Sequence, residues 1–145
     1  MAHLKNTLLI IAFQLLAFNG LAAEQDLVVV VNINNPTSKM SKSQVIDLFM
    51  GRNIAFPNGE KATPIDLIDD NHIKRFFYKN LVGMSLARVN AYWSRVKFTG
   101  RVKPSVKVPS ESGLIQHMHS SPLAIGYMER KHLTKQLKVV YALNE

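Results

Sequence analysis

Apolar runs alternate with amphipathic stretches along most of this chain. The segment 27–31 is an unbroken apolar run rich in valine, which is typical of a strand buried on both faces of a sheet. Shorter apolar segments predict further strands over 62–67, 123–128 and 138–143. The positions between these strands mostly follow a helical period, so strands and helices are expected to alternate.

Four stretches predict helices. The first is expected to begin at Ser41, with Gln44 three residues later in a capping-box pattern, and to end at Gly51. The others are expected over about 71–81, from Ser85 to about 98, and from Ser110 or Ser112 to about 119. The basic, proline-bounded segment 101–109 is predicted to be a connection without regular structure.

This order of elements predicts an α/β protein, a three-layer sandwich around a mixed, mostly parallel sheet. Residues 24–145 contain no internal repeat and no low-complexity linker, so they are expected to form a single domain. The sequence contains no cysteine. Disulfides therefore cannot stabilise the fold, and the hydrophobic core has to do so.

The first 23 residues have the three parts of a secretory signal peptide. Lys5 gives a positive start, 8–21 is mostly apolar, and small residues precede Glu24. The apolar part is shorter than the roughly 20 residues that a spanning helix needs. We expect cleavage near Ala22 or Ala23, a periplasmic protein, and no stable membrane insertion afterwards. An uncleaved N-terminal anchor is the alternative.

The formal net charge of +8 favours acidic partners. Its lysines and arginines are dispersed, without the basic run or motif of a nucleic-acid-binding protein, so no nucleic acid partner is expected. The absence of cysteine excludes a cysteine nucleophile, and no Gly-x-Ser-x-Gly elbow presents a serine. The sequence therefore predicts neither an enzyme nor a cofactor.

A series of short motifs runs through the predicted domain. In order they are NP at 35–36, MSKSQV at 40–45, LFMGR at 48–52, FPNG at 56–59, PID at 64–66, KRFF at 74–77, AYWSR at 91–95, FTG at 98–100 and AIGY at 124–127. Together they resemble the phosphate-type substrate-binding proteins of ABC transporters, in the type II periplasmic binding protein class, and especially a short exported subgroup. The resemblance implies one lobe of a two-lobed fold and phosphate or a similar oxyanion as ligand. It also implies an ABC permease or a second copy of the chain as partner.

The same resemblance implies a ligand site at the start of the second helix. Full-length relatives hold phosphate there with a Ser-Gly-Thr-Arg stretch, and the corresponding residues here are Asn71, His72, Ile73 and Lys74. Helix amides with Asn71, His72 and Lys74 would then contact the anion. The two hydroxyls are missing, however, and Asp69 and Asp70 would repel an anion. An ordinary capped helix is the alternative.

Other polar residues are weaker candidates. Ser41 and Ser43 are a second possible anion site, with a structural capping box as the alternative. Small residues at 110, 112 and 113 form a third, again with helix capping as the alternative. The aspartates and histidines at 69, 70, 72, 117 and 119 are metal-ligand types, but their spacing predicts no metal site.

Two functions follow from these observations. The first is an exported, non-catalytic solute-binding-like protein that binds phosphate or a similar small anion for ABC-type uptake or sensing. The alternative is a periplasmic protein-interaction or accessory module that kept the lobe and lost the ligand. Net charge and the expected export favour the first, whereas Asp69, Asp70 and the missing hydroxyls favour the second.

Overall fold

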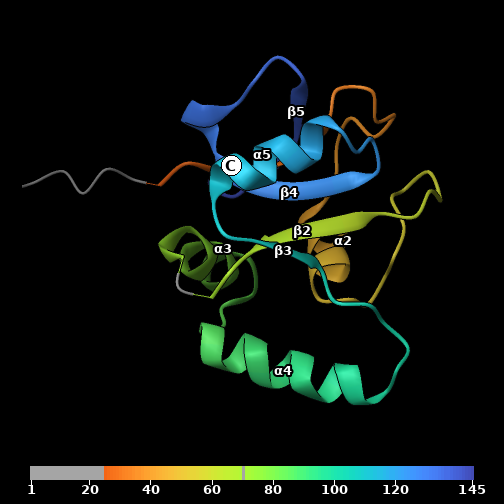
Figure 1. Cartoon of the computed structure of the whole chain (residues 1–145), viewed down its shortest axis with the longest axis vertical. Coiled ribbons are helices and arrows are strands. Elements are labelled where there is room, and N and C mark those ends of the chain that lie inside the picture. The colour runs from red at the N-terminus through yellow and green to blue at the C-terminus, as the bar shows by residue number, and fades with distance from the viewer. Residues whose placement is uncertain (1–24, 70) are drawn as a thin grey trace, which may run out of the picture.

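The computed structural model describes residues 25–69 and 71–145. The predicted signal peptide and Asp70 lie outside the described residues. Within them, one five-stranded sheet forms the centre of the molecule (Figure 1), and its strands are β1 (Leu27–Asn32), β2 (Thr63–Leu67), β3 (Val106–Val108), β4 (Ala124–Glu129) and β5 (Leu137–Ala142).

The strands are ordered β3-β2-β4-β1-β5. β2 pairs in parallel with both β3 and β4, whereas β1 is antiparallel to both β4 and β5. β1 therefore runs against the other four described strands. The predicted mixed, mostly parallel sheet is confirmed.

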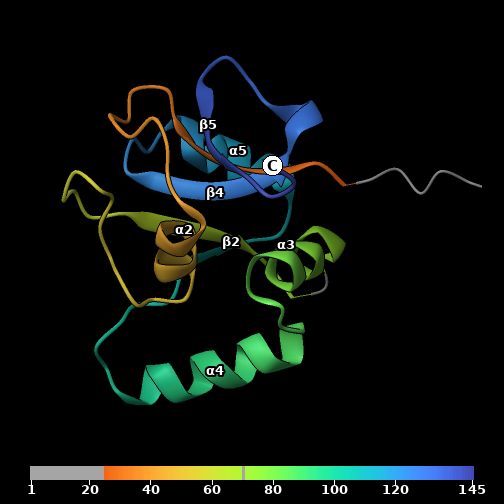
Figure 2. The same cartoon turned by 180° about the vertical axis from the view of Figure 1, so that it is seen from behind.

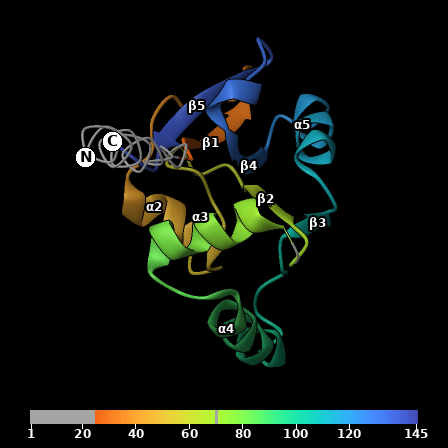
Figure 3. The same cartoon turned by 90° about the vertical axis from the view of Figure 1, so that its left-hand side faces the viewer.

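Helices cover both faces of this sheet. They are α2 (Lys42–Phe49), α3 (His72–Val82), α4 (Leu86–Phe98), α5 (Glu111–His119) and the short 3₁₀ helix η1 (Arg130–His132). Figure 3 shows α5 on one face and α2 with α3 on the other, which is the predicted three-layer arrangement. α4 lies outside α3, as the reverse view also shows (Figure 2).

Serine caps fix where three helices begin. The Ser41 hydroxyl accepts from the Gln44 amide at 3.2 Å, and the Gln44 side chain accepts from the Ser41 amide at 2.8 Å. The predicted capping box is thus confirmed. Ser85 and Ser110 cap α4 and α5 in the same way, by accepting from the amide three residues later.

The core lies between the sheet and its covering helices. Every residue of β1 is buried, as its uninterrupted apolar run predicted. On the α2–α3 face, the rings of Phe77 and Tyr127 stack with centroids 3.8 Å apart, and Phe49 packs edge-on against Phe77 at 5.0 Å. On the other face, Gly126 leaves room for Leu114 of α5. No described helix has both the length and the apolar character needed to span a membrane.

β3 is where the fold departs from expectation. The connection predicted over 101–109 contains this three-residue edge strand, which pairs Val106 with Ile65 and Lys107 with Asp66. The Val-Lys-Val alternation is too short to stand out between two prolines. Its pairing with β2 places a lysine of β3 beside an aspartate of β2, and this determines the layout of the candidate site.

Candidate functional site

The predicted anion site lies where β2 ends and α3 begins, and its three residues point to different surroundings. Asn71 is the N-cap of α3, and its side chain accepts from the Ile73 amide at 2.9 Å. His72 is exposed and lines an open surface depression with Arg75 and Phe76. Lys74 is fully buried. The three side chains therefore do not converge on one opening.

Lys74 forms ion pairs with two carboxylates of the protein itself. Its ammonium lies 2.7 Å from Asp69 Oδ1 and 3.5 Å from Asp66 Oδ2, and its side chain has no exposed area. Burial by itself would lower the pKa of Lys74, but attraction to Asp66 and Asp69 outweighs burial and holds the pKa above its usual value. Lys74 thus carries a charge that neutralises the protein's own acids.

Asp66 is the centre of this buried network. Its side chain is 1% exposed and accepts hydrogen bonds from the hydroxyls of Tyr78 and Tyr127 and from the ammonium of Lys107. Burial, reinforced by the adjacent carboxylate, raises the pKa of both tyrosines well above the usual value, so both remain donors. Three elements thereby supply donors or charge to one carboxylate of β2: α3, β3 and β4.

Asp69 carries the network to the surface. Its side chain is about half exposed, and its second oxygen accepts from the Asn90 amide of α4 at 2.9 Å. The hydrogen bond from Lys74 holds the pKa of Asp69 below its usual value. Asp69 therefore joins the start of α3 to α4 as an ionised acceptor.

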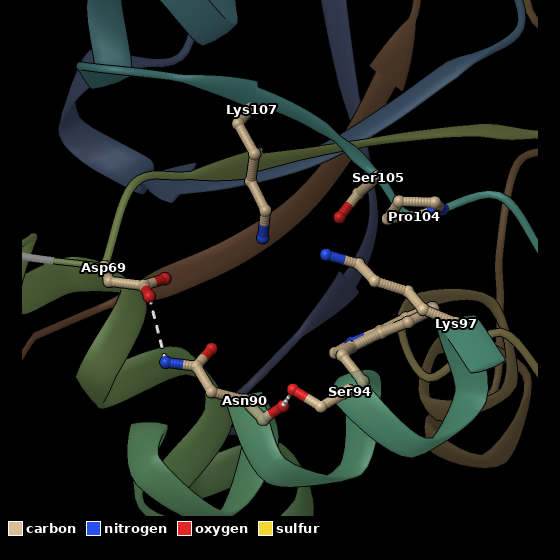
Figure 4. A pocket seen from close by; sticks show the side chains of 8 residues that line it. Asp69, Asn90, Ser94, Lys97, Pro104, Ser105 and Lys107 are labelled. Carbon is tan, nitrogen blue, oxygen red and sulfur yellow. Dashed lines mark hydrogen bonds between the residues drawn. The ribbon is translucent and has the colours of Figure 1, made fainter.

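A pocket of about 340 Å³ opens beside Asp69, between α4 and β3. In Figure 4, the ammonium groups of Lys97 and Lys107 and the hydroxyl of Ser105 point into the same opening. Asn90, Trp93, Ser94 and Pro104 complete its lining. The pocket thus collects donors from two separate elements.

The two lysines of the pocket differ in their surroundings. Burial lowers the pKa of Lys107; attraction to Asp66 opposes this, while the nearby ammonium of Lys74 adds to it. Lys97 makes no ion pair with any of the described residues. Positive charge in the pocket is therefore only partly neutralised by the protein.

The other predicted site residues lie elsewhere. Ser41 is occupied by the capping box of α2, and Ser43 lies exposed in the first turn of that helix. The Ser110 hydroxyl accepts from the Gly113 amide and lies 3.0 Å from the Ser112 hydroxyl. None of these serines lines the pocket beside α4.

Sequence reasoning missed Lys97, Ser105 and Lys107. One signal was available: Asp66 stands inside an apolar strand, and a buried carboxylate requires a cation or several donors. That signal implies a partner lysine without saying which one. The pairing of β3 with β2, which supplies Lys107, has no comparable trace in the sequence.

Comparisons with known proteins bear on the fold. No family model and no curated protein matches the sequence. Solved structures do match it. An ABC-type phosphate transport receptor from Vibrio cholerae has a TM-score of 0.62 at 17% identity, over 79% of this chain and 45% of that one. A Clostridium perfringens protein crystallised with bound phosphate has a TM-score of 0.64 at 13% identity, over 79% and 44%. PstS from Borrelia burgdorferi has a TM-score of 0.58 at 12% identity, over 79% and 46%.

These likenesses establish a shared fold and its extent. The chain spans less than half the length of each of these three structures, as expected for one lobe of a two-lobed protein. The predicted resemblance to phosphate ABC transporter substrate-binding proteins is therefore confirmed at the level of the fold. The chain has the fold of a single lobe of a type II periplasmic binding protein.

Proposed function

We propose that this protein is an exported, non-catalytic solute-binding-like protein that takes phosphate or a similar small oxyanion for ABC-type uptake or sensing. One observation carries the proposal: Lys97, Lys107 and Ser105 direct two ammonium groups and a hydroxyl into one pocket next to the start of α3. The fold likeness to phosphate-transport receptors supports phosphate as the first ligand to test.

The charges around the pocket favour an anion. Asp69 is the acidic residue in its lining, and Lys74 already contacts that carboxylate at 2.7 Å. Lys97 brings a charge that no described acidic residue pairs. A tetrahedral oxyanion accepts hydrogen bonds from several directions and so suits two ammonium groups and a hydroxyl.

A single open lobe sets the expected strength of binding. Two-lobed binding proteins enclose the ligand, and exclusion of water strengthens each polar contact. An exposed ion pair contributes about 0.2–1 kcal/mol, and salt screens it. We therefore propose that high affinity requires a second surface that closes over the anion, supplied by another copy of the chain or by a permease.

Calorimetric titration of the untagged protein with phosphate at low ionic strength, with sulfate as comparison, tests the proposal. Lys97→Gln and Lys107→Gln are expected to weaken saturable phosphate binding by roughly twofold to fivefold each. Lys103→Gln is the matched control, because it removes the same charge from an exposed residue outside the pocket lining. An equal loss in the control would refute this site, and absent heat at millimolar phosphate from folded protein would refute anion binding.

One observation favours a second candidate, a periplasmic interaction or accessory module. A half-exposed carboxylate, Asp69, stands at the start of α3, where an anion would need a donor. Under this alternative the lysines and Asp69 would contact a protein surface. Failure of phosphate and sulfate to bind would select it.

A further inference from the structure

A cluster of carboxylate and imidazole side chains, which are metal-ligand types, lies away from the pocket. Glu111 from the first turn of α5, Glu129 from the end of β4 and His132 from η1 bring one ligand atom each to within 4.8 Å of one another. We propose that these three residues form a binding site for a divalent cation of the Zn²⁺ type.

Both carboxylates are largely buried, and that of Glu111 is held by hydrogen bonds. Their side chains are 11% and 17% exposed, and Glu111 Oε1 accepts from the backbone amide of Glu129 at 2.8 Å. His132 Nδ1 lies 3.0 Å from the same oxygen. In a tetrahedral zinc site with metal–ligand distances of about 2.0–2.2 Å, neighbouring ligand atoms are roughly 3.3–3.6 Å apart. The His132–Glu111 separation is already close to this value, and rotation of the Glu129 side chain, whose ligand atom lies within 4.8 Å of both, would bring the third atom to the same ion.

Charge also favours a cation here. Two largely buried carboxylates repel each other, and a dication between them balances both charges. The structure already places a cation beside one of these carboxylates: the Lys131 ammonium lies 2.7 Å from Glu129 Oε2. The Lys131 side chain is 67% exposed, so it can turn into solvent when a metal ion replaces it.

The donor set selects the type of ion. Zinc accepts imidazole nitrogen and carboxylate oxygen together, and a site with three protein ligands leaves a position for water. Calcium takes six to eight oxygen ligands, which this cluster does not supply. A bound ion would join the start of α5 to the end of β4 and so tie the helix on one face to the sheet.

The test is calorimetry and thermal unfolding of the untagged protein with ZnCl₂. We expect one ion per chain and a rise in the melting temperature with zinc concentration. Glu129→Gln and His132→Gln should each weaken binding at least tenfold, whereas Lys131→Gln, which removes the competing ammonium, should strengthen it. His117→Gln is the control, because it removes an imidazole that lies on α5 and outside the cluster.

Three results would overturn the proposal. They are no saturable binding of zinc by the folded protein, unchanged affinity in both Glu129→Gln and His132→Gln, or a loss of affinity in His117→Gln equal to that in His132→Gln. His132 is about half exposed, so its replacement should not impair folding. Circular dichroism of each variant without zinc establishes that it is folded.

Discussion

Replacing Lys74 by methionine separates a structural role from a ligand role. The sequence predicted that this lysine contacts the anion, whereas the structure places its ammonium against Asp66 and Asp69 with no exposed area. Methionine has a side chain similar in length to the apolar methylene stem of lysine, but it carries no charge. We expect Lys74→Met to destabilise the fold.

The magnitude follows from what the variant leaves behind. Removing one partner of a buried ion pair costs about 3–5 kcal/mol, because the remaining charge stays buried. Asp66 would keep Lys107 and two tyrosine hydroxyls, so the lower end, about 3 kcal/mol, is expected. In a domain of this size, that corresponds to a fall of roughly 10–15 °C in melting temperature.

The assay is urea unfolding followed by circular dichroism, with three comparison variants. Lys107→Met removes a lysine whose side chain is 44% exposed, so it should cost about 1 kcal/mol or less. The double variant Asp66→Asn with Lys74→Met removes both buried charges. It should be more stable than Lys74→Met alone. With Asp66→Asn alone as the fourth member of a double-mutant cycle, the coupling energy should be about 1–3 kcal/mol.

One pattern of results would refute this reasoning. If Lys74→Met unfolds within about 1 kcal/mol of the parent protein while phosphate binding disappears, the ammonium is a ligand group and the buried pair contributes little. The anion site would then be the start of α3, as the sequence predicted.

Three further predictions concern the scaffold. Because the folded protein lowers the pKa of Asp69, the ionised carboxylate stabilises the fold above the unfolded-state pKa, and this stabilisation is lost as the pH falls through the folded-state pKa. Below about pH 4, the urea midpoint should therefore fall less in Asp69→Asn than in the parent protein. Gly126→Ala would place a methyl group 2.9 Å from a leucine of α5 and should cost about 1–3 kcal/mol in the urea unfolding assay. Gly113→Ala, whose new methyl group would make only ordinary van der Waals contacts, should be tolerated in the same assay. Ser41→Ala should lose about 0.5–2 kcal/mol of stability with the capping box and leave phosphate binding unchanged, while Ser43→Ala should change neither.

Local patterns predicted most of the fold because they act over short distances. The apolar run of β1 and the capping box at Ser41 are each specified by neighbouring residues, and both are confirmed. The overall sheet followed from the alternation of strands and helices. β3 was missed because its three residues are stabilised by pairing with β2, a partner about 40 positions away in sequence.

The candidate site was harder to predict because it depends on which charges meet. The helical period of α3 places Ile73, Phe77 and Leu81 against the core, and Lys74 with Tyr78 lies one position further round on a face that is also buried. A lysine there would normally be assigned to solvent. The carboxylate of Asp66 reverses that expectation, and only the packing of α3 on β2 brings the two together.

The balance of charge identifies Lys97 as the lysine of the proposed pocket without an acidic partner among the described residues. Asp66 and Asp69 carry two negative charges, and Lys74 and Lys107 supply two positive charges at 2.7–3.5 Å. This group of four is balanced without a ligand, and an incoming anion must compete with Asp66 for Lys107. Lys97 is the surplus charge among the pocket's described residues. Its removal should therefore weaken phosphate binding more than removal of Lys107, and the reverse order would mean that the anion draws Lys107 away from Asp66.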